Sequence, residues 1–176
     1  MKTTLFLGAA SAALLAGPAL ADFEVFFDVS GPGGNGGTNE FELDGALAGM
    51  NVAADFTNLG GWTWAGDLLI TITDPNGNSI EFGGFDVTQG FPSAGDFPSS
   101  WDSSSSGAYA HNASLASFGL GGSGTWAIGV YDGYTGGSDT DNWIGIINLE
   151  GVELVPAPGA LALLGLAGLA GRRRRR

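Results

Sequence analysis

Apart from its carboxylates, this chain has few residues that could take part in chemistry. Its 176 residues include one histidine, His111, and no cysteine. A single histidine without a Gly-x-Ser-x-Gly elbow argues against a serine hydrolase, and without cysteine it cannot form an ordinary zinc site. The 18 acidic residues show no positional motif for the paired carboxylates of a glycoside hydrolase. We therefore expect no catalytic residues and no enzymatic activity.

Asp74, Asn76 and Asn78 have the Asp-x-Asn-x-Asn spacing with which an EF-hand calcium loop begins. Such a loop needs glycine at its sixth position and glutamate at its twelfth. Here these positions hold Ser79 and Phe85. The segment also contains Asn-Gly, which supplies the positive φ angles of a tight hairpin. We therefore interpret residues 74–78 as a turn.

The acidic residues are concentrated in one part of the chain. Residues 22–154 hold all 18 carboxylates and neither lysine nor arginine, which gives this segment a formal charge of −18. This charge disfavours binding to nucleic acid or to anionic membrane surfaces. Bound Ca²⁺, a saline environment or a merely solvated acidic surface would each be compatible with it. Because cysteine is absent, disulfide bonds cannot stabilise the fold.

The N-terminal residues have the pattern of a secretory signal peptide. Lys2 supplies the positive charge, an apolar run extends from Leu5 to Leu15, and Ala19-Leu20-Ala21 is a small-residue cleavage site. We expect residues 1–21 to be removed after export by the general secretory route.

The C-terminal segment, residues 155–176, has three parts. Val155, Pro156, Ala157 and Pro158 precede an apolar stretch that ends at Gly171, and five arginines follow: Arg172, Arg173, Arg174, Arg175 and Arg176. The apolar stretch is shorter than the roughly 20 residues of a stable transmembrane helix, and the arginines favour a cytoplasmic end. The layout resembles the PEP-CTERM sorting signal of Gram-negative bacteria, although Ala157 replaces the usual glutamate. The resemblance implies a transient membrane anchor, processing by an exosortase, and delivery to the cell surface or extracellular matrix.

Residues 22–154 are typical of one all-β domain, because short apolar runs alternate with Gly, Asn, Asp and Ser clusters. Residues 86–112 are expected to form a long connection. Trp126 and Trp143 are expected in the core. The strands predicted by the pattern are 22–29, 40–44, 50–56, 67–73, 79–82, 126–131 and 143–149.

The same segment resembles a second family over about residues 50–153. Residues 62–77 read WTWAGDLLITITDPNG, residues 124–132 read GTWAIGVYD, and Asn142-Trp143 begins the last strand. These motifs are similar, in the same order, to those of the P domain of subtilisin-like proprotein convertases, with Trp62 in place of the usual histidine. The resemblance implies a jelly-roll β-sandwich of about eight strands, often with bound calcium. It does not imply proteolysis, because the protease module is missing.

The candidate binding residues lie near the ends of these strands. Asp67 and Asp132 each sit at a strand end, where a carboxylate can cap loop backbone or, as the resemblance suggests, bind Ca²⁺. Asp139 and Asp141 are the next calcium candidates. Trp62, Trp64 and Trp101 lie in or near loops, where an aromatic ring can stack on a sugar.

These patterns together predict an exported, non-enzymatic protein of the cell surface or matrix, with a structural or adhesive role. Its expected partners are an exosortase, the membrane for a limited time, and extracellular polysaccharide or surface proteins, but not nucleic acid. Two alternatives are a carbohydrate-binding module and an accessory module for a separate subtilisin-like protease. Exposed tryptophans would favour the first alternative.

Overall fold

The computed structural model describes residues 22–30, 36–60, 62–84, 92–134 and 141–155. The predicted signal peptide and the sorting segment from Pro156 onward lie outside these residues. Within them the chain is mostly β-strand, and its helical residues form three 3-10 turns of three residues each. The all-β prediction is therefore confirmed.

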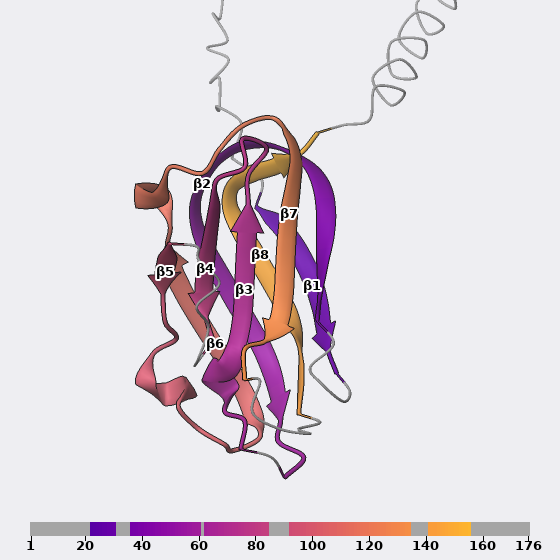
Figure 1. The fold of residues 1–176 in the computed structure, drawn as a ribbon, viewed down its shortest axis with the longest axis vertical. Helices are drawn as coiled ribbons and strands as arrows, with labels where there is room; N and C mark the ends of the chain where they lie inside the picture. Colours follow the sequence, from indigo (N-terminus) through magenta and orange to yellow (C-terminus); the bar gives the residue numbers. More distant parts are fainter. Residues whose placement is uncertain (1–21, 31–35, 61, 85–91, 135–140, 156–176) are drawn as a thin grey trace, which may run out of the picture.

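The strands form one hydrogen-bonded network in the order β1-β8-β2-β7-β3-β4-β5, with β6 paired to β2. Figure 1 shows β3, β4 and β7 in front of a second layer that contains β1, β8 and β6. The strands are β1 Phe23–Val29, β2 Gly37–Thr57, β3 Leu68–Thr73, β4 Ser79–Gly83, β5 Ser93–Gly95, β6 Gly107–Ser114, β7 Gly124–Asp132 and β8 Asn142–Leu154; the 3-10 turns are η1 Ala65–Asp67, η2 Ser99–Trp101 and η3 Ala116–Phe118.

The long strand β2 connects the two layers. Its first part, residues 37–43, pairs with β7, and its second part, residues 49–57, lies between β6 and β8. A register shift between Gly45 and Gly49 separates the two parts, as expected where a β-bulge bends a strand. Gly45 has φ +133°, and a Cβ there would lie 2.2 Å from the carbonyl oxygen of Gly151. A side chain at position 45 would therefore prevent this close approach of β2 and β8.

The hydrophobic core lies between the layers, because alternate residues of the strands point inward. Trp126 and Trp143, which were predicted to be core residues, are both 0% exposed. Burying a large apolar side chain contributes about 1.5–3 kcal/mol, so these two rings stabilise both layers. Other fully or nearly fully buried core residues are Val25, Phe27, Met50, Val52, Phe56, Ile70, Ile72, Ile128, Ile147 and Leu149.

Two sequence predictions about the strands differ from the structure. The candidates 40–44 and 50–56 are both strand, as predicted, but they belong to one long strand, β2; its pairing with β7 ends at Leu43, and its pairing with β8 shifts register between Gly45 and Gly49. The connection predicted over 86–112 contains β5, η2 and most of β6. Strand β6 forms although it is rich in Ala, Gly, Asn and Ser, because it pairs residue by residue with the second part of β2.

The β3–β4 hairpin follows the sequence prediction closely. The two strands pair in antiparallel register from Thr73↔Ser79 to Leu69↔Gly83. Between them the Asp74 carboxylate accepts hydrogen bonds from the backbone N–H groups of Asn76 and Asn78, both at 2.9 Å. Gly77 has φ +82°, as the turn requires. The carboxylate thus organises a turn, as predicted, instead of the start of an EF-hand loop.

No helix within the described residues has the length and apolar character needed to cross a membrane. The apolar stretch at residues 159–171 lies outside these residues.

Candidate functional site

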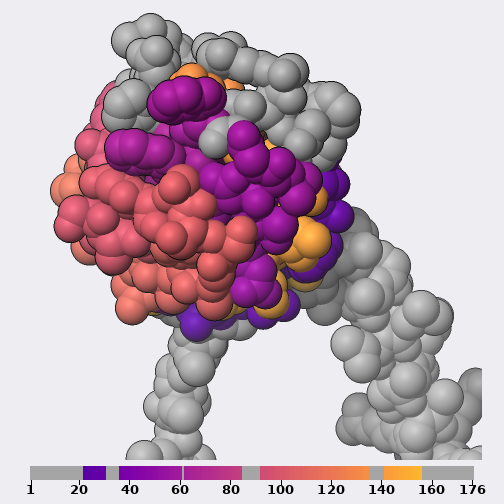
Figure 2. All heavy atoms as spheres, turned by 90° about the horizontal axis from the view of Figure 1, so that it is seen from below, coloured from indigo at the N-terminus to yellow at the C-terminus, as the bar shows by residue number. Residues whose placement is uncertain are grey.

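The candidate site lies at one end of the sandwich, which we call the tryptophan end. It is formed by residues 58–60, 62–67, 96–106 and 132–134, and Figure 2 views the molecule from this end. Three hydrogen bonds connect these segments: Ala65 N–H donates to Ser103 O at 2.9 Å, Asn58 N–H to Ser106 Oγ at 2.9 Å, and Gly133 N–H to Asp67 O at 2.7 Å. Segments far apart in the sequence therefore form one surface.

Two tryptophans are exposed at this end. Trp62 is 83% exposed and Trp64 is 40% exposed, whereas Trp101, Trp126 and Trp143 are at most 1% exposed. Trp62 and Trp64 line a cavity of about 190 Å³ together with Asp67 and Tyr134. We call this the aromatic cavity. It combines apolar ring surface with one buried carboxylate.

The buried carboxylate belongs to Asp67, the last residue of η1, which is 3% exposed. Its Oδ2 accepts a hydrogen bond from the backbone N–H of Trp64 at 2.7 Å, and its own N–H donates to Trp64 O at 3.0 Å. Asp67 thus caps the turn and fixes the backbone position of Trp64. Burial raises the pKa of Asp67 to about 6, despite the Trp64 hydrogen bond, and the negative charges of Asp132, Asp102 and Asp141 raise it further.

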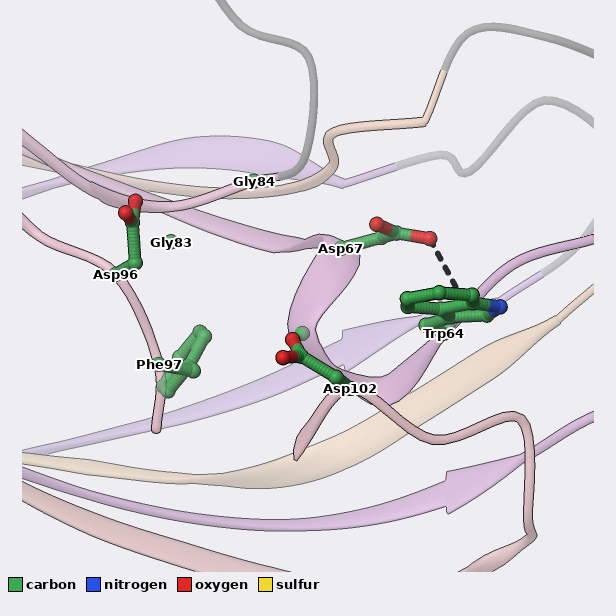
Figure 3. A pocket seen from close by; sticks show the side chains of 8 residues that line it. Trp64, Asp67, Gly83, Gly84, Asp96, Phe97 and Asp102 are labelled. Atoms are coloured by element: carbon green, nitrogen blue, oxygen red, sulfur yellow. Dashed lines mark hydrogen bonds between the residues drawn. The ribbon is translucent and has the colours of Figure 1, made fainter. Parts of the chain in front are cut away.

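A second cavity of about 350 Å³ shares Trp64 and Asp67 with the first. It also contains the carboxylates of Asp96 and Asp102 and the ring of Phe97, as Figure 3 shows. We call this the acidic cavity. Its remaining lining residues are Gly66, Gly83 and Gly84. The absence of side chains at these three positions leaves the backbone as part of the cavity wall.

Trp101 supports the tryptophan end from inside. Its ring stacks on Phe97 with centroids 3.9 Å apart and planes 6° apart, and its Nε1 donates to Ala110 O at 3.4 Å. Because Trp101 is 1% exposed, it is not available for the ligand stacking predicted from the sequence. It positions Phe97 instead. Trp143 supports the same end, because its Nε1 donates a hydrogen bond at 3.1 Å to the backbone oxygen of Ala65, the first residue of η1.

The predicted calcium residues are placed as follows. Asp132 is partly exposed, pairs with Leu68 across β7 and β3, and accepts a hydrogen bond from Tyr134 N–H at 2.9 Å. Asp141 is 1% exposed and accepts a hydrogen bond from Leu59 N–H. Asp139 lies outside the described residues. Asp67 and Asp132 both cap loop backbone, the first of the two roles considered for them.

Within the described residues, no group of three or more His, Cys, Asp or Glu side chains is arranged to hold a metal ion. Calcium binding with the participation of Asp139 therefore stays a prediction. Of the described candidates, Asp132 and Asp141 lie near enough to Asp67 for their negative charges to raise its pKa.

The sequence did not indicate Asp96, Asp102 or Tyr134 as site residues. Asp96 and Asp102 lie in the segment that was expected to be a long connection, and no local spacing relates them to Asp67. The sequence pattern that could have indicated them is an acidic residue next to an aromatic one, as in Asp96-Phe97 and Trp101-Asp102. It is too common to identify a site without the fold.

Comparison with protein-family models gives no match to this chain, and comparison with curated proteins gives none either.

Proposed function

We propose that this chain is an exported, non-enzymatic protein of the cell surface or extracellular matrix that adheres to extracellular polysaccharide through the tryptophan end. One observation carries the proposal: Trp62 and Trp64, two residues apart in the sequence, are both exposed and line one cavity with Tyr134 and Asp67. Ligand sites combine apolar and aromatic walls with a few polar groups. A sugar fits this combination, because its C–H face packs on an aromatic ring and its hydroxyls bond to carboxylates.

The charge of the chain supports the same choice of ligand. Residues 22–154 contain no lysine or arginine, so anionic polymers such as nucleic acid and acidic polysaccharides are disfavoured. A glycan without negative charge meets no such repulsion. The proposal combines the predicted adhesive role with the predicted carbohydrate-binding alternative.

The route to the surface is proposed from the two ends of the sequence. Residues 1–21 act as the signal peptide, and residues 155–176 act as an exosortase-read sorting signal that anchors the chain transiently in the cytoplasmic membrane of a Gram-negative bacterium. Deleting the exosortase gene is then expected to retain the protein in the membrane fraction, as measured by immunoblotting. Unchanged release into the matrix would contradict this route.

The domain itself is proposed to be a P-domain-like jelly roll. Its support is the order of the WTWAGD, GTW and NW motifs. The burial of Trp126 and Trp143 fits this proposal as well. Calcium bound by Asp67, Asp132, Asp139 and Asp141 would stabilise such a domain against its own negative charge.

The adhesive function is tested by binding to immobilised extracellular polysaccharides and to a glycan array. We expect the Trp62→Ala and Trp64→Ala variants to lose about tenfold in affinity each, because one aromatic contact contributes about 1 kcal/mol or more. Phe26→Ala is the matched control, since Phe26 is an aromatic residue of β1 that is 64% exposed and does not line either cavity.

Retention of binding in Phe26→Ala together with loss in both tryptophan variants would support the proposal. If no glycan retains the protein, or if the tryptophan variants bind as the unchanged chain does, the adhesive function at this end is wrong.

A further inference from the structure

Strand β1 lies at one side of its layer (Figure 1) and has an unpaired edge. Among the described residues it pairs with β8 alone, in register from Phe23↔Leu149 to Val29↔Trp143. The backbone N–H and C=O groups on the other side of such a strand form a template for a further strand. The partner that fits this edge is therefore an extended segment.

The side chains of β1 alternate between the core and the solvent, and both sets are related about the central residue, Phe26. The buried set alternates between phenylalanine and valine: Phe23, Val25, Phe27 and Val29. The exposed residues on the two sides of Phe26 are both acidic, Glu24 and Asp28. This pattern allows the strand to pair with a second copy of itself.

Antiparallel pairing of two copies about Phe26 brings all seven residues of each strand into register. A two-fold axis at Phe26 places Phe23 opposite Val29 of the second copy. It also places Val25 opposite Phe27, so every core-facing pair joins an aromatic to a β-branched side chain. Such cross-strand pairs stabilise antiparallel sheets. Moving the axis by one residue leaves five pairs and places Phe26 opposite a carboxylate, so the register about Phe26 is favoured.

On the outer face, the same axis places the two Phe26 side chains opposite one another. Phe26 is 64% exposed. It begins an apolar row across four neighbouring strands, formed by Phe26, Ile146, Ala53 and Ala110. These residues line a groove of about 440 Å³, and contiguous exposed apolar surface is typical of interaction sites. Pairing of β1 with a second copy would cover Phe26 and continue the row across both molecules.

We propose that this protein forms a two-fold dimer through β1, in which the two copies pair about Phe26 and their outer layers become one continuous sheet. A two-fold contact uses the same patch on both copies, as the residue pattern of β1 requires. The seven residues of β1 are fewer than the roughly 20–30 residues that each side of a standard stable interface contributes. The dimer is therefore weak and depends on the protein concentration.

The acidic residues of β1 set a condition on this dimer. The axis places Glu24 opposite Asp28 of the second copy, and this contact occurs twice. Like charges that lie directly opposite one another destabilise a strand pair. Because both side chains are exposed, salt screens their repulsion. The dimer is therefore expected to become tighter as the ionic strength rises.

The first test is analytical ultracentrifugation of the full chain in about 0.01 M and about 1 M NaCl, between which the Debye length falls from about 30 to about 3 Å. We expect a monomer–dimer equilibrium whose dissociation constant is severalfold lower in high salt. Glu24→Gln is expected to tighten the dimer severalfold in low salt. The matched control, Asp55→Asn, removes an exposed carboxylate from β2 in the same layer and should leave the dissociation constant unchanged.

Two outcomes of this experiment would overturn the inference. One is a chain that stays monomeric in both salts up to about 1 mM. The other is an equal tightening by Glu24→Gln and Asp55→Asn, because the net charge of the domain, and not the pairing of β1, would then control association.

Single cysteines test the register, since the chain has no cysteine of its own. Directly opposite residues of an antiparallel pair have Cα atoms about 4.5–5.5 Å apart, within the range of a disulfide. Phe26→Cys is therefore expected to give a disulfide-linked dimer with oxidised glutathione. Ala53→Cys is the control: position 53 is exposed in the same apolar row, but its two copies would lie about five strand spacings, roughly 24 Å, apart. Equal cross-linking of both variants would mean that the copies do not pair about Phe26.

Dimer formation and glycan binding can fail separately. Trp62→Ala is expected to leave the dimer unchanged, because Trp62 is not part of β1; loss of the dimer in this variant would place the contact at the tryptophan end and overturn the inference. Phe26→Ala is expected to weaken the dimer severalfold. Its use as a control for glycan binding therefore requires low salt, where the unchanged chain is monomeric as well.

Discussion

The two aspartates that flank β3 have the same exposure and opposite electrostatics. Asp67 precedes the strand and Asp74 follows it, and each is 3% exposed. Burial raises the pKa of Asp67 to about 6, whereas the pKa of Asp74 is lowered. Burial acts upward on the pKa of Asp74 too, but hydrogen bonds from Asn78, Gly121 and Asn76 outweigh it.

The difference lies in the number of donors around each carboxylate. Asp74 accepts three backbone N–H groups and the Asn78 side-chain amide, which stabilise its charged form. Asp67 accepts one backbone N–H and is surrounded by further carboxylates. Buried carboxylates with such raised pKa values occur at functional sites more often than elsewhere. The hydrogen bonds around Asp74 thus stabilise the fold, whereas the raised pKa of Asp67 makes the tryptophan end the better candidate for ligand binding.

Removing the Asp74 carboxylate is expected to have the largest effect on stability. Asp74→Ala leaves three backbone N–H groups without their acceptor, and hydrogen bonds to a charged group contribute about 1.5–3 kcal/mol each, with incomplete additivity. We expect a loss of about 4 kcal/mol in the free energy of unfolding and a fall of roughly 10 °C or more in the melting temperature, measured by circular dichroism.

Asp44→Ala is the control for that variant, because Asp44 is an exposed carboxylate of β2. Its melting temperature should remain close to that of the unchanged chain. If Asp74→Ala melts no lower than Asp44→Ala, the hydrogen bonds around Asp74 do not stabilise the fold, and the contrast between the two ends disappears.

The Asp74 end could be predicted from the sequence because its signals are local. Alternation in residues 68–73, the Asn-Gly pair and the following apolar run together specify a hairpin, and the structure contains it. Strand β6 could not be predicted in this way. Its composition is that of a loop, and it is a strand because its partner β2, more than 50 residues earlier, offers a free edge.

The tryptophan end was predictable only in part, for the same reason. The loop positions of Trp62 and Trp64 and the strand-end position of Asp67 follow from local pattern. Whether a loop tryptophan is exposed depends on long-range packing, and Trp101 is buried because Phe97 and Tyr109 enclose it. Asp102 reaches Asp67 only through the folding of the chain between η1 and η2.

Replacing Asp67 by asparagine is expected to increase the free energy of unfolding, whereas Asp74→Ala decreases it, and the change is expected to be smaller. Asparagine keeps an oxygen for the Trp64 N–H but carries no charge, so the cost of a buried carboxylate is removed. Raising a pKa from 3.8 to about 6 corresponds to at most about 3 kcal/mol, at about 1.4 kcal/mol per pKa unit. We therefore expect Asp67→Asn to gain about 2 kcal/mol at neutral pH in urea denaturation.

The stability of the unchanged chain is expected to fall as the pH rises, and this explains why Asp67→Asn should be more stable at neutral pH. Between pH 3.8 and about 6 the folded chain keeps a proton on Asp67 that the unfolded chain has lost, so the unchanged protein loses stability as the pH rises through this range. Asp67→Asn lacks this loss, and the two stability curves should therefore converge toward pH 3.8 and separate up to about pH 6. Parallel curves, or a variant that is less stable at neutral pH, would mean that Asp67 is as well satisfied as Asp74.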